Sequence, residues 1–345
     1  MKERGFFQFN ESELSDEKLN EKTKKLLYFL SDNARLSNNE LGRLIRLSSE
    51  GVRKKISTLE EKEVIWPTSL INYKKLGYSV YGIFLQVKEI DPDQKKKFYD
   101  FLQSDFRVLE VAEFTDKIDF CVKLLLKDMD EASYFVDNMA DILYDQITEL
   151  EIFDIKDMIV NRSVPWVYTE KEHFRKIEDK KKNTDQIHEL GKIDEGILNE
   201  LISNSRVKIT KMKQNLKTDM SIGNLIYRKK HIENSGIIDS FSAKVNLSKF
   251  SIHGYYVLLS LNLATQESKH KFKAFLAEKP YILEAFHAIG KWNYVAVIAT
   301  RNLRVLQEFI NKTRTSYHEK LSNIDVLIMY HRLMFPSPVK IVKDD

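Results

Sequence analysis

The sequence predicts an α+β protein made of two tandem modules, each a helix-turn-helix followed by a ferredoxin-like βαββαβ domain. The first observation is an internal repeat, because residues 26–36 return as residues 197–207, about 170 positions later. The second is a change of period in each copy, from helical stripes to short β-rich segments. The third is that these segments follow in the same order after both repeats. A duplicated two-domain module accounts for all three.

The composition is that of a globular protein without a disulfide framework. The 345 residues are 43% hydrophobic and 31% charged, with a formal net charge of +4. This charge is too mild to prove nucleic-acid binding, so a basic footprint must come from clustering. The one cysteine, Cys121, is predicted to be a strand residue rather than a reactive thiol. Because the sequence shows no signal segment and no membrane-spanning apolar run, we expect a cytoplasmic protein without a membrane partner.

Residues 15–68 are predicted to form the first helix-turn-helix. Ser37 and Glu40 give a helix start of capping-box form, and Ser48 or Ser49 opens the next helix. The residues expected on the buried faces of these two helices are Leu41, Leu44, Ile45, Val52, Ile56 and Leu59. Two short helices joined by a tight turn, the second of them basic and serine-capped, are the pattern of a helix-turn-helix.

The exposed face of the second helix in this motif favours DNA as a ligand. Ser49 and Arg53 are expected near the floor of the major groove, next to Ser48 at the helix start. The residues expected to reach the phosphate backbone are Arg43, Arg46 and Lys54. The alternative is a small helical bundle whose basic face is only solvated.

Residues 69–168 are predicted to form the first ferredoxin-like domain. Strands are expected at 78–87, 108–114, 120–126 and 147–159, the last as one strand or as two short ones. Helices are expected to start at Asp91-Pro92 and to span 130–143. This order puts two helices on one face of a four-stranded sheet. The other face would be an exposed apolar patch, so we expect a second sheet of the same kind to cover it.

The second copy repeats this plan after a charged linker predicted at 169–189. Its helix-turn-helix is predicted at 190–242 and its ferredoxin-like domain at 243–340. This helix-turn-helix is degenerate, because it has Lys229 at the position of buried Ile56 and is two residues longer between Arg206 and Leu225 than the first copy. Its basic residues are expected to contact phosphates more than base edges. They are Lys211, Arg228, Lys229 and Lys230.

The chain resembles the Lrp/AsnC (feast/famine) family of prokaryotic transcription regulators over most of residues 19–165. Besides the βαββαβ order, the segments that carry the resemblance are Leu26-Leu27, Arg35-Leu36-Ser37, Glu40-Leu41, Leu47-Ser48, Val52-Arg53, Leu59-Glu60, Val64-Ile65 and Leu76-Gly77-Tyr78. The resemblance implies a winged or simple helix-turn-helix that binds double-stranded DNA. It also implies an αβ-sandwich (RAM) domain that dimerises through its sheet and binds small effectors, often amino acids.

The resemblance further implies an effector site near the turn between the second and third strands, where the family often has Gly-Asp-aromatic-Asp. In the second copy this turn is Gly290, Lys291, Trp292 and Asn293, and Trp292 is the aromatic residue expected to stack on a ligand. The first copy has Asp116 and Asp119 there, with an aspartate in place of the glycine and an isoleucine in place of the aromatic. This departure weighs against effector binding by the first copy. No metal or cofactor is expected.

Two other functions are weighed against a regulator. The first is a siroheme decarboxylase, an enzyme that resembles this chain in its two-domain plan. The sequence shows no convincing His, Arg and Tyr signature at the corresponding strands. We therefore expect no enzyme. The second of these functions is that of an assembly partner that has lost contact with DNA. The sandwich domains are expected to self-associate, either with each other inside one chain as a pseudo-dimer or with a second chain as a homodimer.

Overall fold

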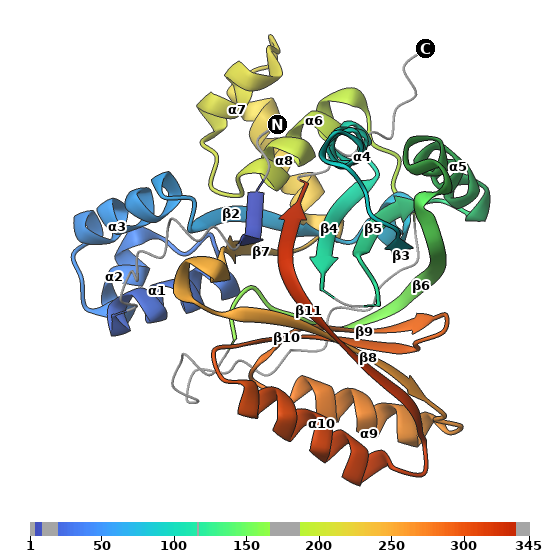
Figure 1. Ribbon diagram of the computed structural model, residues 1–345. Coiled ribbons are helices and arrows are strands. Elements are labelled where there is room, and N and C mark those ends of the chain that lie inside the picture. Colours follow the sequence, from blue (N-terminus) through green and yellow to red (C-terminus); the bar gives the residue numbers. More distant parts are fainter. Residues whose placement is uncertain (1–3, 9–19, 116, 166–186, 336–345) are drawn as a thin grey trace. The chain divides into compact units, whose positions relative to one another are not determined.

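The computed structural model describes residues 4–8, 20–115, 117–165 and 187–335, which fall into two compact units (Figure 1). The first unit contains residues 4–8, 79–165 and 246–335, and the second contains residues 20–78 and 187–245. The first unit therefore combines the two sandwich domains, and the second combines the two helix-turn-helices. The predicted linker, 169–189, lies mostly outside the described residues.

Each sandwich domain has the expected βαββαβ order. The elements of the first copy are β3 (Ser79–Val87), α4 (Pro92–Ser104), β4 (Val108–Phe114), β5 (Phe120–Leu126), α5 (Met129–Leu143) and β6 (Ile147–Asn161). Those of the second are β8 (His253–Leu261), α9 (Gln266–Ala277), β9 (Ile282–Ile289), β10 (Tyr294–Thr300), α10 (Leu303–Tyr317) and β11 (Leu321–Met334). As the sequence predicts, α4 has Asp91 as N-cap and Pro92 in its first turn. Of the two alternatives for the end of the first copy, the structure has one long strand, β6.

The eight strands of the two sandwich domains form a closed ring. Its order is β11-β4-β5-β3-β6-β9-β10-β8, and β8 closes the ring by pairing with β11. The first half of β6 pairs with β3 and its second half with β9, while β11 pairs first with β8 and then with β4. Figure 1 shows β11 crossing in this way from the second copy to the first. The apolar sheet faces are thus covered within one chain, as the intrachain alternative predicts.

The same sheet contains a ninth strand, and the sequence does not predict this strand. β1 (Arg4–Gln8) pairs antiparallel with the end of β11, where its residues lie opposite 331–334. A segment of five residues carries too little periodicity to be recognised as a strand. The partner of β1 becomes apparent only in the structure, where the edge of β11 is available for pairing.

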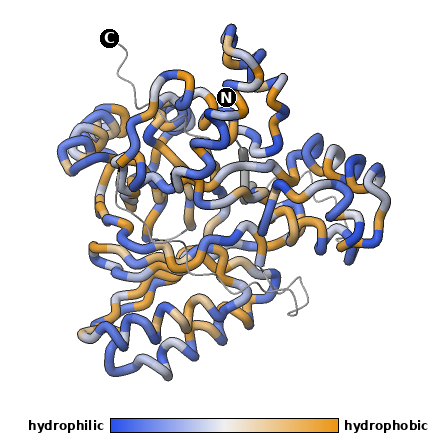
Figure 2. Tube along the Cα trace, turned by 180° about the vertical axis from the view of Figure 1, so that it is seen from behind, coloured by the Kyte–Doolittle hydropathy of each residue, from blue (hydrophilic) through white to orange (hydrophobic). Residues whose placement is uncertain are grey.

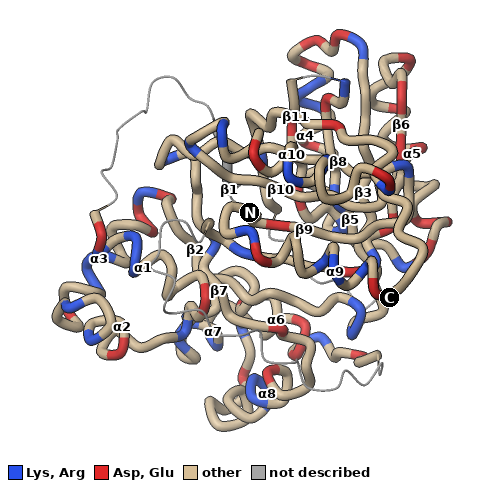
Figure 3. Tube along the Cα trace, turned by 90° about the horizontal axis from the view of Figure 1, so that it is seen from below, with Lys and Arg blue, Asp and Glu red and all other residues tan. Residues whose placement is uncertain are grey.

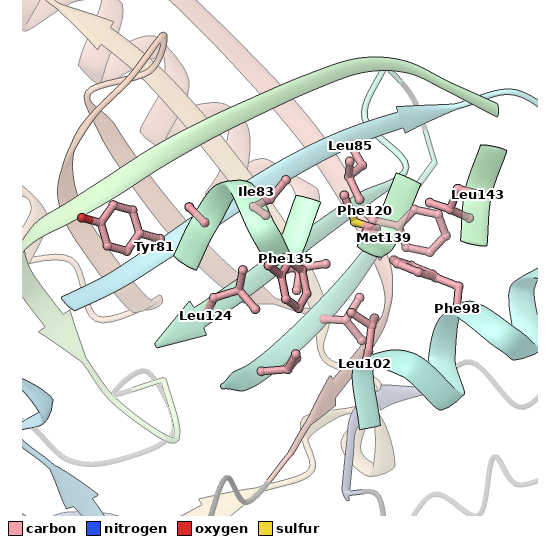
Figure 4. Packing of buried hydrophobic residues seen from close by; sticks show 14 of the residues in the cluster. Tyr81, Ile83, Leu85, Phe98, Leu102, Phe120, Leu124, Phe135, Met139 and Leu143 are labelled. Atoms are coloured by element: carbon pink, nitrogen blue, oxygen red, sulfur yellow. The ribbon is translucent and has the colours of Figure 1, made fainter. Parts of the chain in front are cut away.

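The hydrophobic cores of the first unit lie between the helices and the outer side of the ring. In the first copy, Phe98 and Leu102 of α4 and Phe135 of α5 pack against strand residues such as Ile83 and Leu124 (Figure 4). The corresponding helix residues of the second copy are Phe272, Leu276 and Phe309. Burial of each such side chain contributes roughly 1.5–3 kcal/mol. Figure 2 shows hydrophobic residues gathered in the strands of this unit, which agrees with their burial.

The inside of the ring holds a buried network of four charges. Lys123 Nζ of β5 lies 2.7 Å from Glu110 Oε1 of β4 and 2.8 Å from Glu284 Oε2 of β9. Arg332 of β11 binds the same two glutamates. Burial raises the pKa of Glu110, but Arg332 and Lys123 outweigh this effect and lower that pKa overall. Glu110, Lys123 and Arg332 therefore remain charged, and their ion pairs join strands of both copies.

Cys121 lies on β5 close to this network. It is fully buried, and burial raises the pKa of its thiol to about 12. A thiol with such a pKa carries almost no thiolate at neutral pH. The prediction of a strand residue rather than a reactive thiol is confirmed.

The second unit contains the two helix-turn-helices, each followed by one strand. The first consists of α1 (Glu21–Asp32), α2 (Asn38–Ile45), α3 (Ser49–Glu61) and β2 (Ile65–Ile71). The second consists of α6 (Lys192–Ser203), α7 (Ile209–Leu216), α8 (Ile222–Asn234) and β7 (Ile238–Val245). The predicted capping box of Ser37 and Glu40 is present at the start of α2, and Ser48 rather than Ser49 caps α3.

The prediction for Leu44 is wrong. This residue was expected on the buried face of α2, but 43% of it is exposed. α2 has only eight residues, and Leu41 and Ile45 fill its contact with the rest of the domain. A helix of two turns offers a buried stripe too narrow for a third large apolar side chain.

The two helix-turn-helices are joined by exchanged contacts. β2 pairs antiparallel with β7, from Ile65 opposite Val245 to Ile71 opposite Ile238. The strand after each reading helix thus pairs with the other copy instead of folding back as a wing hairpin, as a winged helix-turn-helix would have it. Serine and threonine hydroxyls on each strand donate to helix carbonyls of the other copy, namely Thr68 to Ile202, Ser69 to Leu201 and Ser242 to Ser31.

Two arginines at equivalent places in the repeat strengthen this exchange. Arg35 lies 3.6 Å from the centre of the Phe241 ring and forms an ion pair with Glu233. Arg206 donates to the carbonyl oxygens of Ala34 and Leu36, at 2.6 and 2.9 Å. Each arginine therefore binds the opposite copy, so the two helix-turn-helices form a single body.

Candidate nucleic-acid interface

The turn between α2 and α3 is tight, and Gly42 makes it sterically feasible. Arg46 ends α2 in the left-handed conformation, with φ of 56°, and the Leu47 N–H donates to the Gly42 carbonyl at 2.9 Å. A Cβ at position 42 would lie 2.5 Å from the Leu47 carbonyl oxygen, closer than atoms in proteins approach. Two residues, Leu47 and Ser48, separate Arg46 from α3, so the turn exposes the start of this helix.

The first helix-turn-helix exposes every residue that the sequence assigns to DNA. These residues are Arg43, Arg46, Ser48, Ser49, Arg53 and Lys54. The Ser48 hydroxyl accepts from the Gly51 N–H at 3.1 Å, so it acts as the helix cap. The Arg53 guanidinium is held in a two-bond ion pair by Glu50, with Nε 2.8 Å from Oε2. The outer side of α3 is therefore polar and charged, and Figure 3 marks its basic positions.

In the second helix-turn-helix, the predicted basic residues divide into two groups. Lys211 and Lys230 are exposed. Arg228 forms an ion pair with Asp194 of α6, with NH1 3.0 and 2.9 Å from the two carboxylate oxygens. Lys229 lies 3.3 Å from Glu233, which also binds Arg35. The structure therefore gives Arg228 and Lys229 intramolecular partners, where the sequence suggested phosphates.

The outer side of the first half of α8 carries three large hydrophobic side chains, which the sequence analysis missed. Ile222, Ile226 and Tyr227 are 43%, 40% and 72% exposed. Counted from the first residue of each helix, they stand where α3 has Ser49, Arg53 and Lys54. An alignment of the two helices from their serine caps, Ser48 and Ser221, is the signal that would have found this substitution.

The effector turn predicted in the second copy, between β9 and β10, is packed into the protein. Only 7% of Trp292 is exposed; its Nε1–H donates to Asp325 at 2.9 Å and its ring meets Phe84 edge-on. The Asn293 side chain binds both the N–H and the carbonyl of Leu261, at 2.9 and 2.7 Å. The expected stacking surface of Trp292 is thus occupied by the protein itself.

The first two residues of this turn, Gly290 and Lys291, differ in their surroundings. A Cβ at Gly290 would lie 2.9 Å from Phe153 Cβ, so a larger residue would displace strand β6. The Lys291 side chain is exposed, while its N–H donates to Glu151 at 2.8 Å. Of the four predicted effector residues of this copy, Lys291 offers its side-chain charge to solvent.

The corresponding turn of the first copy is tied down in a similar way. Asp119 accepts a hydrogen bond from the Val87 N–H at 2.8 Å, and burial raises the pKa of its carboxyl. This contact is the counterpart of that between Asn293 and Leu261. Asp116 lies outside the described residues. The acidic or amide residue at the end of each turn therefore fixes the backbone of the neighbouring strand.

A further polar cluster lies where β11 crosses to β4. Glu113 is buried, and its carboxylate accepts hydrogen bonds from Tyr99 and from Tyr330, the latter at 2.6 Å. Its partners also include Lys95 Nζ at 2.5 Å and His331 Nδ1 at 2.6 Å. Burial raises the pKa of Glu113, but the hydrogen bonds from His331, Lys95, Tyr330 and Tyr99 outweigh it and lower the pKa to about 2. No pattern in the sequence predicts this cluster, because its members are far apart in the chain.

Comparison with known proteins places the chain among transcription regulators. Residues 19–65 match the family described as winged helix-turn-helix DNA-binding, and residues 255–334 match the Lrp/AsnC ligand binding domain. The HTH-type transcriptional regulator Ptr1 of Methanocaldococcus jannaschii is 31% identical over 114 residues, which are 32% of this chain and 75% of that protein. The chain belongs to the Lrp/AsnC family. A second relative, the HTH-type transcriptional regulator LrpA of Pyrococcus abyssi, is 29% identical over 39% of this chain and 89% of its own length.

The tandem form of this Lrp/AsnC protein has a structural counterpart. The crystal structure of the siroheme decarboxylase NirDL matches with a TM-score of 0.58 and 12% identity, over 91% of this chain and 92% of NirDL. At this identity the likeness concerns the fold alone. Among the helices of the described residues, none is both long and apolar enough to cross a membrane.

Proposed function

We propose that this Lrp/AsnC-type, DNA-binding transcription regulator reads its operator mainly through α3, with the sandwich ring serving assembly and effector sensing and without enzymatic activity. The observation that carries the proposal is the exposed N-terminal half of α3. There a hydroxyl, a guanidinium and an ammonium group stand together, on Ser49, Arg53 and Lys54. Such groups hydrogen-bond base edges and phosphates, whereas the same positions of α8 have two isoleucines and a tyrosine, with no charged group.

The pair of Glu50 and Arg53 supports a role in base reading. An arginine held by a neighbouring carboxylate keeps its planar fork in one orientation before DNA arrives. Arginine prefers the O6 and N7 atoms of guanine, and glutamate accepts from the N4 amino group of cytosine. The two side chains together therefore suit a G·C base pair at the centre of the half-site.

The exchanged contacts of β2 and β7 support an asymmetric operator. They hold two unlike helices, α3 and α8, in one body, so a single chain presents two different reading heads. A dimer with identical heads reads a palindrome. We expect the half-sites of this protein to differ in sequence.

The distribution of the family matches supports a division of labour between the copies. The DNA-binding match covers the first helix-turn-helix, and the ligand-binding match covers the second sandwich domain. We therefore assign effector sensing to the second copy, with Lys291 as the exposed charge beside the turn. A small anion, such as the carboxylate of an amino acid, is the effector that this charge would attract.

Selection of bound DNA from a random pool, with and without amino acids, tests the proposal. We expect enrichment of an asymmetric site with a G·C pair that Arg53→Ala no longer prefers. A flat sequence preference combined with no salt-dependent binding to duplex DNA would favour the assembly-partner alternative.

The enzymatic alternative rests on the likeness of fold to NirDL, which is a siroheme decarboxylase. The ion pairs of Glu110, Lys123, Glu284 and Arg332 inside the ring support our preference, since they engage the charged side chains there with one another. Added siroheme is therefore expected to give no spectral shift and no CO2. Either signal would restore the enzyme hypothesis.

A further inference from the structure

We propose that α8 is a second DNA-reading helix that recognises the C5-methyl groups of thymine through Ile222, Ile226 and Tyr227. The inference rests on the proposed function, since it needs the protein to bind duplex DNA. It goes beyond that function because it gives the degenerate helix-turn-helix a base preference of its own. The three side chains are exposed although they belong to large apolar types. A monomeric surface seldom keeps such a group on one helix without a ligand.

The position of these side chains identifies the ligand. They occupy the places that Ser49, Arg53 and Lys54 occupy on α3, counted from the serine cap of each helix. The buried faces agree at two of three positions, with Leu225 and Ile232 where α3 has Val52 and Leu59, while Lys229 replaces Ile56. α8 is therefore seated in its domain as α3 is, and its outer side faces whatever a reading helix faces.

Charge complementarity also favours DNA. Lysines lie on α8 and on the neighbouring helix α7 with its two ends, namely Lys208, Lys211, Lys213, Lys217 and Lys230. Lysines beside an apolar group suit the phosphate backbone beside a groove. They disfavour a second copy of the same face, because two such groups of lysines would repel each other.

The chemistry of the groove defines what an apolar helix reads there. In the major groove, thymine is the base that presents a methyl group, and apolar side chains make contact with it. Ile226 and Tyr227 have no charged group that would select guanine or cytosine. Gly223 lies between Ile222 and this pair, and open space surrounds the place of its missing Cβ apart from the Ser221 hydroxyl at 3.9 Å. The helix backbone therefore has room to approach the methyl groups closely.

The test uses the full chain and two versions of the duplex obtained from the random pool. In one half-site of each version, thymine is replaced by deoxyuridine, which forms the same base pair but lacks the methyl group. We expect one version to bind about three- to fourfold more weakly for each contacted methyl, the factor that corresponds to one buried carbon. The other version, in the half-site of α3, should bind as before.

Variants assign the effect to a helix. Ile226→Ala and Tyr227→Ala should abolish the sensitivity to deoxyuridine, whereas Arg53→Ala should keep it while binding more weakly overall. Alanine favours helix, and both residues are exposed, so the variants are expected to fold; thermal unfolding checks this.

Three results would overturn the inference. The first is tight duplex binding with no effect of deoxyuridine in either half-site. The second is a deoxyuridine effect that persists in Ile226→Ala and Tyr227→Ala. The third is a change from dimer to monomer in these variants, measured as a lower mass in solution, with unchanged DNA binding. That result would make a second copy of the chain the occupant of this face of α8. Failure of the proposed function is a different outcome, namely that neither duplex binds.

Discussion

α3 and α8 start from the same structural place and present opposite chemistry. Both begin after a serine cap, run for 13 residues and bury apolar side chains at matching positions. On the outside, α3 shows Ser49 and Arg53, while α8 shows Ile222 and Ile226. Duplication thus preserved the face that folds the domain and changed the face that meets a ligand. The lesson is that the buried pattern identifies the motif, whereas the exposed residues decide what it recognises.

The two sandwich domains also have unlike residues at matching positions. Substitution of Lys123 is expected to have the largest effect, on the free energy of unfolding. Its counterpart in the second copy is Val297, which is also buried. We expect Lys123→Met to reduce the free energy of unfolding by about 3–5 kcal/mol, because Glu110 and Glu284 would keep only Arg332 as a counter-charge. Urea unfolding at pH 7 measures it, with Val297→Ala as the matched control that only creates a cavity. Equal losses in the two variants would contradict a role of charge.

Glu113 and its counterpart His287 provide the next comparison. Because hydrogen bonding lowers the pKa of Glu113 to about 2, its stabilisation is complete above the unfolded pKa of about 4.3 and is lost as the pH falls towards 2. We expect Glu113→Gln to lose about 3 kcal/mol at pH 7 and to approach the wild type near pH 2. Unfolding free energies from pH 7 to pH 2 test this, with exposed Glu149→Gln as the control. A difference that stays constant over this range would mean that the charge of Glu113 is not responsible.

Arg53 and Arg228 separate recognition from internal pairing. We expect Arg53→Ala to weaken binding to the selected duplex by about 1–3 kcal/mol and to relax the preference at one base pair. Arg228→Ala should leave sequence preference unchanged, because this side chain pairs with Asp194 of another helix, α6, and is less exposed than Arg53, at 41% against 66%. Fluorescence anisotropy at a fixed salt concentration, with a scrambled duplex alongside, measures both. If the two variants changed the preference equally, the division between the copies would be wrong.

Lys230 gives the smallest expected effect. It is exposed on α8, at the position where α3 has Ser57. We expect Lys230→Ala to lower affinity equally for all sequences and to reduce the slope of log K against log salt by about 1. A series of binding titrations at increasing salt checks it, and Ser57→Ala serves as the matched control. An unchanged slope would place Lys230 away from the phosphates.

Much of the fold follows from local patterns in the chain. The capping box of Ser37 and Glu40, the helix start at Asp91-Pro92 and the βαββαβ order are confirmed, because caps and periodicity depend on residues close in sequence. The strands β1, β2 and β7 and the exposure of Leu44 escaped prediction. All of them depend on what a distant segment covers or leaves open, and no short pattern contains that information.

The candidate site shows the same limit. Exposure of Arg53 and Lys54 follows from the helical period and is found. The partners of Arg228, Lys229 and Trp292 are not readable in this way, since Asp194 and Asp325 are more than 30 residues from Arg228 and Trp292 and carry no mark of pairing. Even Glu233, which is only four residues from Lys229, also forms an ion pair with Arg35 of the other copy.

The tandem of two modules, and most of their helices and strands apart from β1, β2 and β7, can be predicted from the sequence alone. Those properties follow from periodicity, caps and a repeat, all of which are local or rest on self-similarity. The tertiary structure alone decided how the copies exchange partners, with β6 and β11 closing a ring and β2 pairing with β7. It also explained why Arg35 and Arg206 recur in the repeat, since each binds the opposite copy. A strand edge or a guanidinium group that is removed from water needs hydrogen-bond partners, but only the folded chain selects which groups these are.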